Sequence, residues 1–309
     1  MDGAVKSNAG NGNTSDAGDA GALALALAGA VPQEASTEGL RWHAGRWWWT
    51  DVEGAVLYLW TPGGEPLRSR LPDSVAAFAF CQSGRVLLAQ DKWLCFADLA
   101  VPPAQGLSRR TPRAAVAVDP AEPRTAISDG DTDRAGNFVF GTAIDGVTPA
   151  TPAIGSFYQY SLRHGLRRLA LPTASVANSI CFSPDGGTMY FSDAATRRIL
   201  QCDYNAGAAR VANVRPFAEL ADGQPRGAVI DSAGCLWSAQ AGTGRVQRYA
   251  PDGVLLHSVA VPTTEPARPA FGGPQLAQLL VGSAAGGLHL LDGAGARGLP
   301  GALFDDRKI

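Results

Sequence analysis

Residues 178–193 read NSICFSPDGGTMYFSD, which is two short apolar segments on either side of a turn. The turn, SerProAspGlyGly at 183–187, consists of residues that favour tight chain reversals. Short apolar segments bounded by such turns are typical of paired strands, so this stretch predicts a β-hairpin. A second turn of the same kind, AlaProAspGly, occurs at 250–253.

The same unit of apolar strand, glycine-containing turn and second apolar strand recurs six times along the chain. Its copies start 38, 54, 49, 48 and 42 residues apart, at Leu40, Phe78, Thr132, Cys181, Val229 and Phe271. That period is typical of a four-stranded propeller blade, whereas helical repeats of similar length would space apolar residues by three and four. We therefore predict an all-β, six-bladed β-propeller; a pair of β-sandwiches is the rival, but would not require six copies.

The N-terminal part of the chain contains two stretches of different composition. Residues 1–20 are small and polar and predict a disordered segment, which leaves 21–309 as a single propeller domain. The following run ALALALAGAV, Ala22–Val31, alternates Leu and Ala as a strand would. We expect residues 23–28 of this run to pair with the last blade, because an open ring would expose two unpaired sheet edges.

Composition and charge exclude several kinds of partner. The formal net charge is −2 without long blocks of like charge, which makes nucleic acid an unsuitable partner. No apolar run approaches the roughly 20 residues that cross a membrane. The cysteines lie in apolar runs without a CxxC pair, at Cys81, Cys95, Cys181, Cys202 and Cys235. This pattern indicates reduced core thiols and a cytoplasmic protein.

From about Leu23 to Leu291 the chain resembles the regucalcin, gluconolactonase and luciferin-regenerating-enzyme-like family. The likeness rests on the stretch at 178–193, on RVQRYAPDG at 245–253 and on TEPARPAFGGPQLAQLLVGSA at 264–284. The resemblance implies a six-bladed propeller that hydrolyses sugar lactones in carbohydrate metabolism. It also implies one divalent cation, calcium or zinc, held by a Glu, an Asn and an Asp.

Two of the family's three metal ligands have counterparts here. Glu38 in TEGLRW matches the first and Asn178 the second, but Arg226 in QPRGAVID stands at the position of the third. A guanidinium about 4 Å from a divalent cation would repel it by roughly 8 kcal/mol at an effective dielectric constant of about 20. The sequence therefore predicts an incomplete metal site, and an Arg226–Glu38 ion pair is one arrangement that would take the metal's place.

The resemblance also points to residues that contact substrate. The family's Arg-x-Asn-Asp-Gly segment corresponds to residues 126–130, of which Asp129 and Gly130 are kept and Ser128 replaces Asn. Arg124 lies two residues before the family's Arg, and Asp145 stands where an acidic residue often follows the Gly–Thr of the third blade. Together with Arg226, these residues, Arg124, Ser128 and Asp145, are the predicted substrate-binding set.

Two hypotheses for function follow. In the first, the chain is a sugar-lactone hydrolase with an altered metal site, in which Arg226 polarises the lactone carbonyl or grips a sugar-acid carboxylate. The base that activates water is then Glu38 or Asp129. In the second, the chain is a non-catalytic propeller that binds a sugar acid or a protein partner through the same channel mouth.

Overall fold

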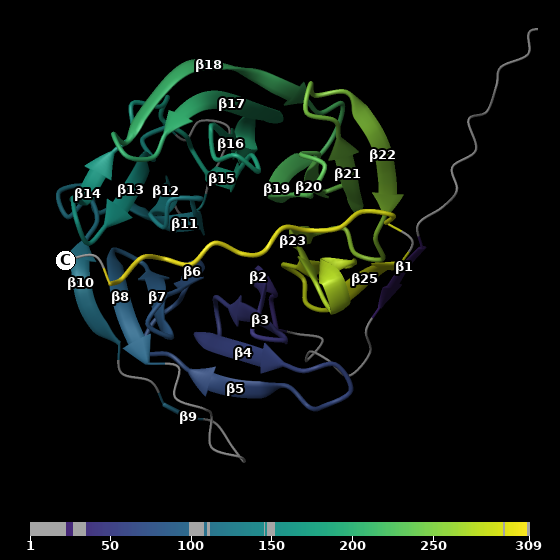
Figure 1. The fold of residues 1–309 in the computed structure, drawn as a ribbon, viewed down its shortest axis with the longest axis horizontal. Coiled ribbons are helices and arrows are strands. Elements are labelled where there is room, and N and C mark those ends of the chain that lie inside the picture. The colour runs from purple at the N-terminus through teal and green to yellow at the C-terminus, as the bar shows by residue number, and fades with distance from the viewer. Residues whose placement is uncertain are drawn as a thin grey trace, which may run out of the picture.

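Six β-sheets form a ring of blades around one axis in the computed structural model, as Figure 1 shows, and we call the region along this axis the channel. The structure describes residues 23–26, 35–98, 108–109, 112–144, 146, 152–292 and 294–307. Within these ranges the regular secondary structure is almost entirely strand and forms six blades, which confirms the predicted six-bladed propeller. Residues 1–20, expected to be disordered, lie outside the described residues.

With two exceptions, the strands of each blade follow one another along the chain, from the channel outwards; the exceptions are the outermost strands of blades 1 and 6. Blade 1 contains β2 (Glu38–His43), β3 (Arg46–Asp51), β4 (Val56–Trp60), β5 (Leu67–Arg70) and the added β9 (Ser108–Arg109). Blade 2 contains β6 (Ala77–Phe80), β7 (Arg85–Gln90), β8 (Trp93–Asp98) and β10 (Arg113–Ala117). Blade 3 contains β11 (Thr125–Thr132), β12 (Phe138–Ile144), β13 (Phe157–Ser161) and β14 (Gly165–Arg168).

The second half of the chain continues the pattern. Blade 4 contains β15 (Ala177–Phe182), β16 (Thr188–Asp193), β17 (Arg198–Asn205) and β18 (Arg210–Glu219), with the 3-10 turn η1 (Ala194–Thr196). Blade 5 contains β19 (Gln224–Ile230), β20 (Leu236–Ala241), β21 (Arg245–Tyr249) and β22 (Leu255–Ala260). Blade 6 contains β23 (Pro266–Gly272), β24 (Gln278–Ser283), β25 (Leu288–Asp292) and β1 (Leu23–Ala26), with η2 (Pro274–Leu276).

The ring is closed by the first described strand. β1 pairs antiparallel with β25, from Leu23 opposite Asp292 to Ala26 opposite His289. This confirms the expected closure for residues 23–26, and it removes the open edges that an unclosed ring would leave. The other expected residues of this strand lie outside the described ranges.

Aromatic and aliphatic side chains fill the spaces between blades. Trp47 and Trp49 are fully buried, and Trp49 stacks on Tyr58 with ring centroids 5.1 Å apart. Each fully buried large side chain contributes roughly 2 to 3 kcal/mol to folding. All five cysteines are buried and free, as expected, and burial raises the pKa of the Cys81 thiol to about 12.

The last described residues cross one mouth of the channel, where Figure 1 shows them in yellow in front of the ring. We call residues 297–306 the C-terminal strap. At one end Gly298 N donates to Leu276 O (2.9 Å), and at the other Phe304 N donates to Phe80 O (2.8 Å). Asp306 then accepts hydrogen bonds from Ser83, so the strap is fixed across the ring from blade 6 to blade 2.

Neither of the 3-10 turns, nor any other helix in the described ranges, has the length and apolar character that crossing a membrane requires.

Candidate active site

A cavity of about 460 Å³ opens at the mouth of the channel where the inner strands begin. Its polar lining comes from four blades and consists of Ser36, Glu38, Glu53, Ser128, Asn178, Gln224 and Arg226. Small side chains cover much of the remaining wall, namely Ala76, Ala126, Ala143, Ala194, Ala241 and Ala284. The structure therefore brings Glu38, Asn178 and Arg226 together at one mouth, and it places Ser128 with them.

Local backbone geometry aims these three side chains into the cavity. Glu38, Asn178 and Arg226 lie at equivalent places in β2, β15 and β19, and each inner strand then changes register against its neighbour. The residue after each has a left-handed backbone: Gly39 with φ 61°, Ser179 with φ 60° and Gly227 with φ 79°. Bulges of this kind re-aim a side chain away from the regular sheet faces.

Glu38 and Arg226 form the ion pair that the sequence had suggested. The distance between Arg226 Nη2 and Glu38 Oε1 is 2.7 Å, with side-chain exposures of 38% and 19%. A second carboxylate, Glu265, approaches the same guanidinium, with Oε2 3.9 Å from Arg226 Nη1. Burial raises the pKa of Glu38 above its ordinary value, and the neighbouring Arg226 offsets this effect only in part.

Glu265 was not among the residues predicted from the sequence, although the chain contains a signal for it. Residues 37–41 read TEGLR and residues 264–268 read TEPAR, so blades 1 and 6 begin with the same Thr-Glu-x-x-Arg pattern. The Glu of each copy lies near Arg226. The Arg of each copy, Arg41 and Arg268, lies deeper in the channel.

Asn178 has a structural use for its amide oxygen. Oδ1 accepts hydrogen bonds from Ser179 N (2.7 Å) and from Gly227 N (2.8 Å), which ties blade 4 to blade 5. Close packing explains the glycine, because a Cβ at Gly227 would lie 2.5 Å from the Cα of Arg268. Both acceptor positions of the amide oxygen are therefore occupied by backbone donors.

Asp129 faces away from the cavity that holds Glu38. Its Oδ2 accepts from Ile180 N (3.0 Å), and its Oδ1 accepts from Gly130 N (2.8 Å) and lies 3.2 Å from Arg268 Nη1. The register shift between Ile127 and Asp129 makes Ser128, not Asp129, the residue that lines the cavity. The Ser128 hydroxyl donates to Ala177 O (2.7 Å).

Asp129 belongs to a buried group of charges in the middle of the channel. We call Arg41, Asp129, Asp131 and Arg268 the central ion-pair cluster. Asp131 contacts Arg41 and Arg268, at 2.6 Å each. Burial alone would raise the pKa of Asp131, but the two guanidiniums together hold it below its ordinary value.

The two remaining predicted substrate-binding residues do not join the site. Arg124 is exposed and forms an ion pair with Glu122 at 2.7 Å, away from the cavity lining. Asp145 lies outside the described residues.

The class of this protein is a six-bladed propeller with a polar cavity at the start of its inner strands. Its family is defined by comparison with known proteins. Residues 36–285 match the SMP-30/Gluconolactonase/LRE-like region. The chain belongs to this family.

Two curated relatives illustrate the range of the family. The L-arabinolactonase of Azospirillum brasilense is 44% identical over 230 residues, which cover 73% of this chain and 73% of the relative. The 6-deoxy-6-sulfogluconolactonase of Pseudomonas putida is 30% identical over 241 residues, covering 76% of this chain and 78% of the relative.

Solved structures share the fold. A luciferin-regenerating enzyme superimposes with a TM-score of 0.85 at 23% identity, covering 92% of this chain and 99% of the other. Regucalcin from Agrobacterium tumefaciens, described as a calcium-binding protein, superimposes with a TM-score of 0.79 at 26% identity. That match covers 90% of this chain and 97% of the relative.

The residues at this site do not fit the divalent cation that the family resemblance implies. Arg226 forms an ion pair with one oxygen of the Glu38 carboxylate, and the Asn178 amide oxygen already accepts hydrogen bonds from two backbone donors. Hard cations need several oxygen ligands, and the carboxylate expected as the third ligand is replaced here by a positive charge. Among the described residues, no group of three or more His, Cys, Asp or Glu side chains is arranged to hold a metal ion.

Proposed function

We propose that this chain hydrolyses a sugar lactone without a resident divalent cation. The observation that carries the proposal is the Glu38–Arg226 pair on the wall of a polar cavity, where both side chains are partly open to solvent. The 44% identity to an L-arabinolactonase supports a sugar lactone as the substrate class. It also makes L-arabinonolactone the first compound to test.

Arg226 supplies the positive charge that the reaction needs. The lactone carbonyl oxygen takes the place of Glu38 at one guanidinium nitrogen, so the negative charge that develops on this oxygen faces Arg226. Glu265, 3.9 Å from the other guanidinium nitrogen, holds the arginine in the cavity meanwhile. Ser128 and Gln224 line the same cavity and offer polar groups to the sugar hydroxyls.

Glu38 acts as the base, because it is the carboxylate in the cavity that contacts Arg226 directly. It accepts a proton from water as the water oxygen bonds to the carbonyl carbon. Collapse of the tetrahedral intermediate breaks the bond to the ring oxygen, which takes the proton back from Glu38 and leaves as a hydroxyl. The product is the open-chain hydroxy acid. A raised pKa of Glu38 suits this exchange, since it makes the carboxylate a stronger base.

The proposal is tested by measuring hydrolysis of a panel of aldonolactones against the uncatalysed rate, with and without a chelator. We expect activity that survives the chelator and falls by about 10²- to 10³-fold in kcat in Arg226→Gln. Glu38→Gln should show a loss of similar size. The matched controls are Arg163→Gln and Glu219→Gln, which alter exposed charges outside the cavity.

Two outcomes contradict the proposal. Full activity in Glu38→Gln would show that Glu38 is not the base. Loss of wild-type activity in the presence of chelator would show that the reaction requires a metal ion. Binding of a sugar acid without turnover of any lactone would favour the non-catalytic alternative.

A further inference from the structure

A second cavity, of about 340 Å³, lies at the opposite end of the channel, beneath the C-terminal strap. The inner strands run from one cavity to the other: Glu38 begins β2 at the first cavity, and His43 ends β2 at the second. In β11, Ser128 lines the first cavity and Thr132 lines the second. The central ion-pair cluster lies between them, so the second cavity is separate from the proposed active site.

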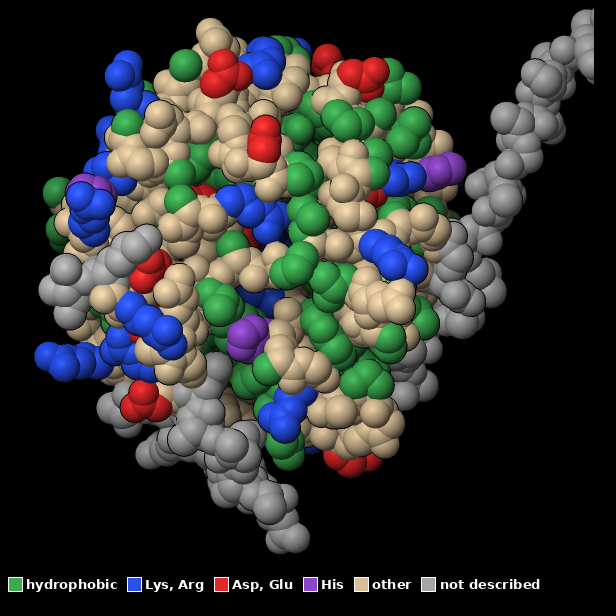
Figure 2. All heavy atoms as spheres, in the orientation of Figure 1, with side chains coloured by type: hydrophobic (Ala, Val, Ile, Leu, Met, Phe, Trp, Pro, Cys, Tyr) green, Lys and Arg blue, Asp and Glu red, His purple; other side chains and the backbone are tan. Residues whose placement is uncertain are grey.

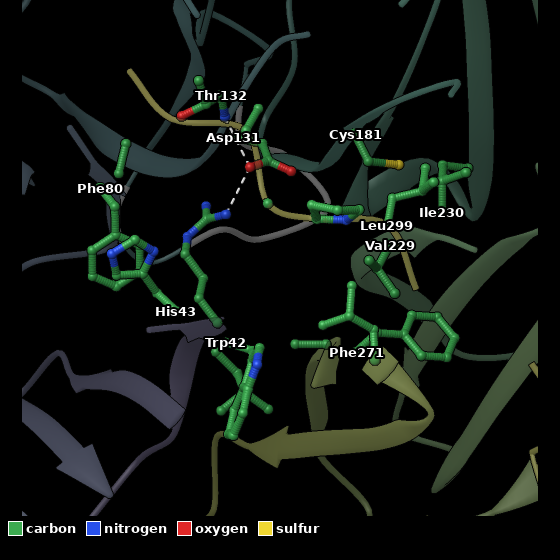
Figure 3. Close-up of a pocket in the computed structure, with 18 of the residues that line it drawn as sticks. Trp42, His43, Phe80, Asp131, Thr132, Cys181, Val229, Ile230, Phe271 and Leu299 are labelled. Atoms are coloured by element: carbon green, nitrogen blue, oxygen red, sulfur yellow. Dashed lines mark hydrogen bonds and ion pairs between the residues drawn. The ribbon is translucent and has the colours of Figure 1, made fainter. Parts of the chain in front are cut away.

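The walls of this cavity differ in character. Figure 3 shows Val229, Ile230, Phe271 and Leu299 together on one side, His43 beside Phe80 on the opposite side, and Asp131 and Thr132 between these two sides. A cavity with an apolar wall and polar groups on its other sides suits an amphiphilic molecule.

His43 adds an uncharged planar group to the polar side. Its ring stacks on Phe80, with centroids 3.9 Å apart and an angle of 13° between the planes. Burial lowers the pKa of His43, which favours the neutral imidazole. No hydrogen bond to this imidazole occurs among the residues that the structure describes, which leaves it available to a ligand.

The charges around the cavity favour an anion. Three guanidiniums line it, those of Arg41, Arg134 and Arg268, against the one carboxylate of Asp131. Counting Asp129 as well, which pairs with Arg268, leaves a net charge of one positive unit. Arg134 is the guanidinium outside the central cluster; it is exposed at the channel mouth and donates to the strap at Pro300 O (3.1 Å). Figure 2 shows Lys and Arg side chains near the centre of this face beside hydrophobic ones.

We propose that this second cavity binds a small amphiphilic carboxylate, with its hydrocarbon body on the apolar wall and its carboxylate towards Arg134 and His43. The volume of about 340 Å³ is more than twice the roughly 150 Å³ of an engineered cavity that takes up benzene. A chain of about eight carbons therefore fits. The proposal does not depend on lactone hydrolysis, because it concerns the other end of the channel.

The test is titration calorimetry of the full chain with sodium octanoate, hexanoate and octylammonium. We expect one octanoate to bind per chain. Hexanoate, two methylenes shorter, should bind about fifteenfold more weakly, since each buried methylene contributes about a fourfold gain in affinity. Octylammonium, with the same hydrocarbon and the opposite charge, should not bind.

Variants at the cavity separate specific from general binding. Arg134→Gln, on a side chain at the channel mouth, should weaken octanoate about tenfold, whereas the exposed matched control Arg163→Gln should leave it unchanged. Leu299→Glu, which places a carboxylate on the apolar wall, should abolish binding, with its fold checked by circular dichroism.

The proposal is overturned if octanoate does not bind, or if Arg134→Gln binds it as tightly as wild type. It is equally overturned if Arg226→Gln, at the other cavity, weakens octanoate as much as Arg134→Gln, since the ligand would then occupy the first cavity.

Discussion

Replacing Arg226 with aspartate should convert the site at Glu38 into one that binds divalent cations. In the wild-type chain, Glu38, Arg226 and Glu265 carry a summed charge of −1, and the substitution changes this to −3. It also supplies the third ligand that the family resemblance implies, an aspartate carboxylate, in place of the guanidinium that now contacts Glu38 at 2.7 Å.

The size of the gain follows from the geometry. A guanidinium about 4 Å from a divalent cation repels it by about 8 kcal/mol at an effective dielectric constant of about 20. The Arg226 side chain is 38% exposed, so solvent screens this repulsion, and the side chain can turn outward. Half of the repulsion corresponds to about a thousandfold in affinity. Because Asn178 must release a backbone donor to act as a ligand, we expect a gain of about a hundredfold.

Titration calorimetry with calcium, zinc and manganese measures this gain directly. Arg226→Gln is the matched control, because it removes the repulsion without adding a ligand and should give an intermediate affinity. Micromolar binding of a divalent ion by the wild-type chain would refute the reasoning, as would an aspartate variant that binds no better than the glutamine variant.

Three further predictions concern the ionised groups. Lactone hydrolysis should decline as pH falls through the raised pKa of Glu38. In Arg226→Gln this decline in kcat/KM should occur about one pH unit higher, because loss of the cation disfavours the charged carboxylate. An unchanged pH profile would show that Glu38 is not the base. Asp131→Asn leaves two buried guanidiniums short of a counter-charge and should lower the free energy of unfolding by about 3 to 5 kcal/mol in urea titrations, whereas exposed Asp252→Asn should have little effect. The Asp306 carboxyl is buried, which opposes ionisation, but Ser83 and Arg85 hold its pKa below the ordinary value. Its stabilising effect is therefore present at neutral pH and lost as pH falls through that lowered pKa. Asp306→Asn should lower the melting temperature at pH 7, and the loss should shrink as the solution is acidified through the Asp306 pKa. A loss that does not change with pH would contradict this.

The sequence by itself determined the number of blades and the closure of the ring. The number of blades depends on local information, because a hairpin is specified by its own turn and by the apolar residues beside it, as at 183–187. The closure depends on a general rule instead: an open ring would leave two unpaired sheet edges, so the early strand was expected to pair with the last blade, far from it in the chain. The contact of Glu38 with Arg226 was one arrangement suggested by the family resemblance, because the two residues stand at the family's first and third metal-ligand positions.

Only the tertiary structure decided which residues beside these points reach the cavity. A register shift in β11 turns Ser128 towards the cavity and Asp129 towards Arg268, and a shift of one residue in a strand reverses the faces. The central ion-pair cluster and the cavity beneath the strap join residues far apart in the chain, such as Arg41 and Asp131. No local pattern encodes such contacts, because they exist only once the ring has closed and brought the inner strands of different blades together.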